Sequence, residues 1–295
     1  MTTRQEKIIQ ISFFITVTMF FIQLIGGFIT NSLAILSDAW HLSTDILALF
    51  LSWFAIRQTR KPANETHTYG YHRFGSLAAL INGLTLIAVS LFIAYQSITR
   101  LIHPAHVHST GMIGLAIIGF LATLLITLIL KNDTENINVK SAFLHFLGDV
   151  LSYFSIIIGG ILIYFTDVYW IDPILSGIFA LVILRNAWEV TREASLILLE
   201  AVPGKLSIPR IKERLLIESE IVKVLDLHVW GLSNEHISLS THLAIRNMEF
   251  QQTGTLIHRI EEILYEEFGI AHTTIQFHVE SQEINSTIRS VPNIH

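Results

Sequence analysis

Long apolar runs occupy most of the chain up to residue 190, and they restrict what it can fold into. A helix needs about 20 apolar residues to cross the hydrocarbon core of a bilayer. Six segments reach this length: residues 8–30, 33–56, 74–99, 111–131, 141–165 and 171–190. Because lipid offers the backbone no hydrogen-bond partners, such segments cross a membrane as helices. The sequence therefore predicts an integral membrane protein with an all-α, six-helix transmembrane domain.

Composition supports this prediction and excludes several kinds of site. Of the 295 residues, 51% are hydrophobic and only 15% are charged, whereas soluble domains carry about 25% charged residues. The net charge of −5 argues against nucleic acid as a partner. The chain has no cysteine, so disulfides and thiolate metal sites are excluded. Any metal must be held by His, Asp, Glu or backbone oxygen.

Basic residues gather at alternate ends of the six segments. One side carries Arg4, Lys7, Arg57, Arg60, Lys61, Arg73, Lys131, Lys140, Arg185 and Arg192, and the other carries only Arg100 near a segment end. Because Lys and Arg in loops mark the cytoplasmic side, both termini are predicted to be cytoplasmic. The short loops suggest a bacterial inner membrane.

The pattern changes after Pro203-Gly204. Residues 207–219 and 251–268 have helical periodicity, and residues 222–231, 236–246 and 272–280 read as strands. This αββαβ order predicts a small cytoplasmic α+β module of the ferredoxin-like kind. We therefore expect two domains, a transmembrane domain over residues 1–200 and a cytoplasmic regulatory or dimerisation domain over residues 201–295.

Two polar motifs interrupt the apolar segments, His41-Leu-Ser-Thr-Asp45 and His145-Phe-Leu-Gly-Asp149. Residues four apart lie on one face of a helix, so each motif offers an imidazole beside a carboxylate. Placing an ionised Asp near the bilayer centre costs roughly 2.5–3.5 kcal/mol of insertion free energy, so such a residue usually has a function. Four such ligands suit a tetrahedral Zn²⁺ site, and Cd²⁺, Co²⁺ or Ni²⁺ fit the same donors. The alternative is a hydrogen bond within each helix and no shared ion.

Asp38 lies one helical turn before His41 and has two interpretations. It can be a carboxylate at the outer mouth of the site that passes the metal on. It can equally cap the start of its helix, where Asp is common.

Further motifs surround the two metal motifs: Ser32-Leu-Ala-Ile-Leu-Ser-Asp38, Tyr69-Gly-Tyr-His72-Arg73, Asn82-Gly83, Asp172-Pro173 and Leu198-Leu-Glu-Ala-Val-Pro203. Together with the paired motifs, they resemble the cation diffusion facilitators over residues 8 to about 280. The resemblance implies a homodimeric exporter that exchanges metal for protons. A His at position 41, where other members carry Asp, is similar to the zinc-preferring branch.

The resemblance also points to metal ligands outside the membrane. His242, His258 and His278 match positions where family members bind regulatory metal, and His228 and Glu280 lie nearby in sequence. Leu225 departs from the pattern, because some members carry a His there. His67 and His72 match a loop site through which metal enters from the cytoplasm. For each of these histidines, an ordinary surface or half-buried residue is the alternative.

The function predicted from these residues is proton-coupled export of Zn²⁺, with zinc as substrate and as a possible regulatory ligand. Protons and metal compete for imidazole nitrogen near neutral pH, and no nucleotide-binding loop is present. An intramembrane metalloprotease is disfavoured because the chain has no His-Glu-x-x-His motif, so we expect no enzyme. A membrane metal sensor, which binds zinc without moving it, is the second candidate.

Overall fold

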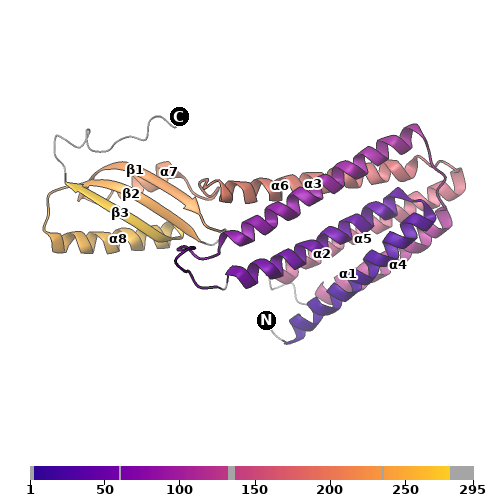
Figure 1. Ribbon diagram of the computed structural model, residues 1–295, viewed down its shortest axis with the longest axis horizontal. Coiled ribbons are helices and arrows are strands. Elements are labelled where there is room, and N and C mark those ends of the chain that lie inside the picture. The colour runs from indigo at the N-terminus through magenta and orange to yellow at the C-terminus, as the bar shows by residue number, and fades with distance from the viewer. Residues whose placement is uncertain (1–2, 60, 132–136, 234–235, 280–295) are drawn as a thin grey trace. The chain divides into compact units, whose positions relative to one another are not determined.

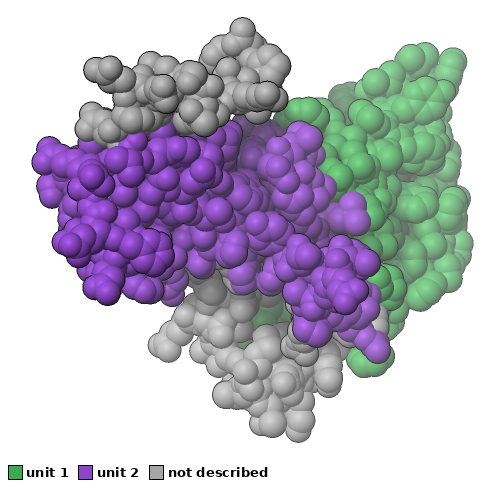
Figure 2. Space-filling view, turned by 60° about the vertical axis from the view of Figure 1, so that its left-hand side comes forward, with its two compact units in different colours: residues 1–54, 78–191 green, residues 55–77, 192–295 purple. Residues whose placement is uncertain are grey.

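The structure is a computed structural model that describes residues 3–59, 61–131, 137–233 and 236–279 (Figure 1). Its chain divides into two compact units, residues 1–54 with 78–191 and residues 55–77 with 192–295, which Figure 2 shows in green and purple. The elements in chain order are α1 (Thr3–Thr30), α2 (Leu33–Thr59), α3 (Arg73–Ile102), α4 (Ser109–Leu130), α5 (Ile137–Thr166), α6 (Ile171–Leu198), α7 (Ile208–Leu215), β1 (Ile221–Gly231), β2 (Ile237–Ile245), α8 (Phe250–Phe268) and β3 (Ile270–Val279).

The first unit consists of long helices with apolar outer surfaces. Within the described residues, the stretches long and apolar enough to cross a membrane are five: Phe13–Thr30, Arg73–Ile102, Ser109–Leu130, Phe143–Thr166 and Ile171–Leu198. Large apolar side chains such as Phe14, Ile29 and Phe165 point outward, with 69%, 72% and 78% of their surface exposed. Such surfaces need lipid as their solvent. The prediction of an integral membrane protein is confirmed.

The start of α2 is fixed by a carboxylate from another helix. The chain bends at Asn31, with φ of 52°, and α2 begins at Leu33. Asp172, on the first turn of α6, accepts hydrogen bonds from Ser32 Oγ at 2.5 Å, from the Leu33 N–H at 2.7 Å and from the Ala34 N–H at 3.1 Å. Asp172 therefore caps α2, whereas Asp38 lies inside the helix. The interpretation of Asp38 as the cap is wrong because Asp172 satisfies the free N–H groups.

Helices α2, α4 and α5 share a tightly packed apolar cluster. It comprises Ala34, Ile35, Val107, Met112, Ala116, Tyr153, Ile156 and Ile163, all buried. Tyr153 fits there because Gly119 of α4 has no side chain; a Cβ on Gly119 would lie 2.2 Å from the tyrosine ring. Close approach at small residues is how membrane helices pack, since lipid gives them no hydrophobic drive to associate. The cluster holds α2 and α5 in register.

The second unit contains a three-stranded sheet in the order β1-β2-β3. β2 pairs antiparallel with β1 and parallel with β3. Apolar residues from α7, α8 and the strands form its core, among them Ile211, Leu239, Leu243, Leu256 and Ile260. The predicted order of helices and strands after residue 203 agrees with this structure, although α7 ends earlier than predicted, at Leu215.

The capping role of Asp172 predicts a large loss of stability on its removal. Asp172→Ala deletes the acceptor of three hydrogen bonds and leaves Arg100, 3.9 Å away, without its nearest carboxylate. We expect a loss of about 3–5 kcal/mol, which is typical of breaking a buried charged network. Thermal unfolding of the purified protein in detergent measures it.

Glu189→Ala is the matched control, because the Glu189 side chain is 63% exposed and its ion pair among the described residues is with Arg185 of the same helix. Its removal changes the free energy of unfolding by no more than about 0.5 kcal/mol. Equal unfolding temperatures for Asp172→Ala and Glu189→Ala contradict the assignment.

Candidate metal site

The two polar motifs meet between α2 and α5. Each helix presents its His and Asp on one face, because the residues are four apart. The helices run in opposite directions, so the pairs align in reverse order: His41 lies against Asp149, and Asp45 lies against His145. The structure therefore brings together all four residues that the sequence identified in the membrane.

The distances between ligand atoms are short and nearly equal. His41 Nε2 lies 3.8 Å from Asp149 Oδ1, and His145 Nε2 lies 3.5 Å from Asp45 Oδ2. Within each helix, the corresponding distances are 3.9 Å for His41 to Asp45 and 3.8 Å for His145 to Asp149. The two imidazole rings have centroids 5.9 Å apart and meet edge to face. The alternative of two separate intrahelical pairs does not describe this arrangement.

These distances approach those of a tetrahedral metal site. Zn²⁺ binds nitrogen and oxygen at about 2.0–2.2 Å, which places neighbouring ligand atoms about 3.3 Å apart. Ligand atoms of His41, His145 and Asp149 all lie within 4.8 Å of one another. Asp45 is not in this group of three, but its Oδ2 lies 3.9 Å from His41 Nε2 and 3.5 Å from His145 Nε2, which makes it the candidate fourth ligand.

The carboxylates of Asp45 and Asp149 do not find hydrogen-bond partners for all of their oxygens within the described residues. Asp149 is 8% exposed. Within the part of the chain that the structure describes, Oδ2 of Asp45 and Oδ2 of Asp149 are buried and form no hydrogen bond of ordinary geometry. A buried carboxylate oxygen in this state is costly. A cation or protons at the site relieve that cost.

A third contact joins the same two helices. The Tyr153 hydroxyl donates a hydrogen bond of 2.6 Å to Asp38 Oδ2. Tyr153 is fully buried and Asp38 is half-buried. Tyr153 was not among the residues predicted from the sequence. Its position four residues after Asp149, on the same helix face, was the available signal.

The predicted cytoplasmic ligands are only partly brought together. His242 Nδ1 and His278 Nε2 lie 3.1 Å apart on neighbouring strands, with stacked rings. His228 instead contacts Asp226 at 2.9 Å, and the exposed His258 lies 3.5 Å from Glu261. Glu280 lies outside the described residues. Among described residues, a cluster of three or more metal-binding side chains occurs only in the membrane unit.

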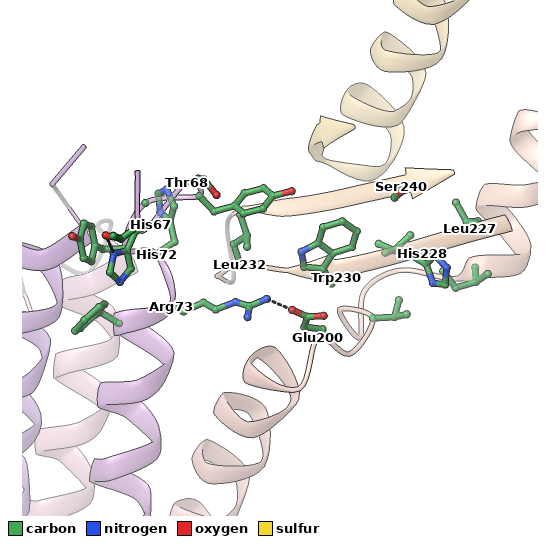
Figure 3. A pocket seen from close by; sticks show the side chains of 18 residues that line it. His67, Thr68, His72, Arg73, Glu200, Leu227, His228, Trp230, Leu232 and Ser240 are labelled. Atoms are coloured by element: carbon green, nitrogen blue, oxygen red, sulfur yellow. Dashed lines mark hydrogen bonds and ion pairs between the residues drawn. The ribbon is translucent and has the colours of Figure 1, made fainter. Parts of the chain in front are cut away.

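The loop histidines border a cavity of about 760 Å³ in the second unit (Figure 3). His67 stacks on Tyr71, with centroids 4.4 Å apart, and His72 stacks on His236 at 4.2 Å. Partial burial and the charge of His236 lower the pKa of His72. Arg73 and Glu200 form an ion pair of 2.8 Å along the wall. His67 and His72 therefore each stack on a different ring.

Comparison with known proteins covers both units. Residues 9–199 match the cation efflux transmembrane domain, and residues 203–282 match the cytoplasmic domain of cation efflux proteins. The chain is similar to three curated proteins named for metal transport. It is 36% identical to the cadmium, cobalt and zinc/H(+)-K(+) antiporter of Bacillus subtilis strain 168, over 98% of this chain and 94% of that protein.

The chain is also 33% identical to the zinc transporter ZitB of Escherichia coli K12, over 90% of this chain and 85% of that protein. With the metal cation efflux system protein CzcD of Cupriavidus metallidurans it shares 32% identity, over 92% of this chain and 86% of that protein. Two matched domains that together span most of the chain, and relatives matched nearly from end to end, establish that this protein belongs to the cation efflux family, the cation diffusion facilitators.

Proposed function

We propose that the protein exports Zn²⁺ from the cytoplasm in exchange for protons, with His41, Asp45, His145 and Asp149 as the transport site. The observation that carries this proposal is the pairing of two imidazoles with two carboxylates at 3.5–3.9 Å between helices of a membrane unit. Relatives named as zinc transporters and as an antiporter of cadmium, cobalt and zinc support zinc as substrate. The same N₂O₂ donors accept Cd²⁺, Co²⁺ and Ni²⁺.

Exchange of zinc for protons follows because both compete for the same nitrogen and oxygen atoms of the site. A metal ion binds neutral imidazole and ionised carboxylate, so its arrival displaces protons. If the bundle alternates between an inner-open and an outer-open state around this site, metal loads on one side and protons displace it on the other. The proton gradient then drives export without a nucleotide.

Several features of the whole molecule complete the proposal. α2 is the sixth span, both termini are cytoplasmic, and the membrane is the bacterial inner membrane. The boundary between the domains lies near residue 200, with a ferredoxin-like cytoplasmic module over residues 201–295. Two copies of the chain form a homodimer, as the resemblance to the family implies.

A regulatory metal site in the cytoplasmic module is a separate proposal. The stacked pair of His242 and His278 supports it, because two adjacent imidazole nitrogens are ready donors to Zn²⁺. Glu280, two residues after His278 in sequence, is a candidate third ligand, and His228 and His258 are weaker candidates. His67 and His72 are proposed to receive metal from the cytoplasm before it reaches the membrane.

A metal sensor is the alternative function. It predicts tight binding with no flux, and the match to a transport family argues against it. Zinc uptake into inside-out vesicles, with and without an imposed pH gradient, separates the two. Binding without proton-linked uptake favours the sensor.

Removal of a ligand is expected to abolish transport. Asp149→Ala or His145→Ala should lower zinc uptake into inside-out vesicles by at least about 100-fold, since even residues that only support metal ligands cost 10–100-fold. Asp167→Asn is the control for the carboxylate, because Asp167 lies exposed in the loop between α5 and α6. His103→Ala, in the exposed loop after α3, is the control for the imidazole. Retained uptake in both ligand variants refutes the assignment.

Zinc binding is expected to weaken as the pH falls. Histidine has a reference pKa of about 6.5, and only its neutral form binds metal, so affinity drops by roughly tenfold or more per pH unit below that value. Titration calorimetry in buffers of different ionisation enthalpy measures both the affinity and the protons released. The wild type should release protons near pH 6, and His41→Ala should release fewer. A pH-independent affinity contradicts proton competition.

A further inference from the structure

The hydrogen bond between Asp38 and Tyr153 continues the pattern of the metal site. Along α2, Asp38, His41 and Asp45 follow one face, and their partners on α5 are Tyr153, Asp149 and His145 in that order. The three contacts form a ladder between antiparallel helices, with successive rungs one helical turn apart. Asp38 and Tyr153 form the rung nearest the start of α2 and the end of α5. We call this end of the bundle the outer end, as the proposed topology requires.

Beyond the ligands, the outer rung packs mainly among apolar side chains, with the buried Gln23 as a polar neighbour of Tyr153. Tyr153 belongs to the buried cluster that includes Ile35, Met112, Ala116 and Ile156. Its ring also lies where a side chain on Gly119 would be, so the ring packs directly against the backbone of α4. Because a divalent cation needs polar ligands or water throughout its path, the apolar packing around Tyr153 is unfavourable for a cation leaving at the outer end.

Exposure along the α5 side of the ladder rises away from Tyr153. Tyr153 is fully buried, the Asp149 side chain is 10% exposed and the His145 side chain 43%, whereas on α2 His41 and Asp45 are similar at 28% and 24%. On α5, the exposed ligand is thus the one nearer the inner end, His145, and the buried residue is the one at the outer end, Tyr153. This is the arrangement required of a carrier that waits to load from the cytoplasm.

We propose that Tyr153 and Asp38 form the outer gate of the metal site, and that their hydrogen bond holds the gate closed in the inward-facing state. The proposal rests on the transport function argued above. Opening requires the Tyr153 hydroxyl to leave Asp38. That movement frees a carboxylate one turn beyond the ligands, where it attracts the departing cation. Tyr153 is thus a positioning residue, because it does not bind the metal itself. It acts on the site by holding Asp38 and by keeping the outer gate closed.

A purely structural role for the same hydrogen bond makes a different prediction. A buried tyrosine hydroxyl needs some partner, and Asp38 supplies one. If that were its only role, loss of the hydroxyl would lower stability and leave access to the site unchanged. Access from each side of the membrane therefore distinguishes the two roles.

The chain has no cysteine, so a single introduced thiol can report access. Asp45→Cys places the reporter among the ligands, on the inner side of the gate. Its reaction with a membrane-impermeant thiol reagent is measured separately from the outer and inner faces of vesicles. Tyr153→Phe and Asp38→Ala are added to this background. Tyr164→Phe, on the exposed surface of α5, is the matched control.

We expect Tyr153→Phe and Asp38→Ala to raise the rate of labelling from the outer face by about tenfold or more, the shift expected from losing a hydrogen bond to a charged group. Asp38→Asn retains an acceptor oxygen and should label more slowly than Asp38→Ala. Labelling from the inner face should stay within about twofold, which also shows that each variant is folded.

Outer labelling that matches the parent in both Tyr153→Phe and Asp38→Ala overturns the gate. Using Asp38→Ala as a second variant keeps the test valid if one of them fails to fold. The reporter does not depend on zinc movement, so failure of the gate is distinct from failure of the transport function. Zinc flux in the chain with all four ligands tests that function separately, and Tyr153→Phe should there allow zinc to leak in the absence of a pH gradient.

Discussion

An ionisable group inside a lipid bilayer is costly, and this protein meets that cost by pairing groups across two antiparallel helices. Asp45 and Asp149 cannot face acyl chains, and neither finds a full set of partners on its own helix. Placing α2 against α5 gives each carboxylate an imidazole from the opposite helix as well as one from its own. Each carboxylate still keeps one buried oxygen without a hydrogen bond among the described residues, which is the feature that suits the proposed exchange of a cation for protons.

The geometry of this site depends on contacts made some distance away. Asp172 of α6 caps α2 and fixes where that helix begins, and hence the height of His41 and Asp45. The apolar cluster around Tyr153 fixes α5 against α2 and α4. A shift of one residue along either helix would rotate a ligand off the shared face, since successive residues on a helix lie about 100° apart. The capping contact and the cluster therefore serve the ligand geometry as much as they serve stability.

Much of this arrangement was predictable from sequence because it follows from spacing within one helix. The length of the apolar runs predicts the spans, and His and Asp four residues apart predict a shared face. Partners between helices are different, because periodicity identifies the faces of a helix and not the residue that lies opposite. Tyr153 therefore reads as one more aromatic residue in an apolar run, and Asp172 as the first-turn acid of its own helix. In the cytoplasmic unit, His242 and His278 meet because of the parallel register of β2 and β3, which no local pattern reveals.

If His41, Asp45, His145 and Asp149 form the transport site, charge balance favours exchange of zinc for protons. Two carboxylates within a low-dielectric bundle carry a net charge of −2 when they are ionised and the imidazoles are neutral, and one Zn²⁺ cancels that charge. A site that released zinc outward and reset empty would hold two uncompensated negative charges inside the bundle, which is costly. Returning with protons restores neutrality. On electrostatic grounds, the proposed site resets more readily with protons bound than empty, and the repulsion between the two carboxylates in the empty site would couple zinc export to proton entry.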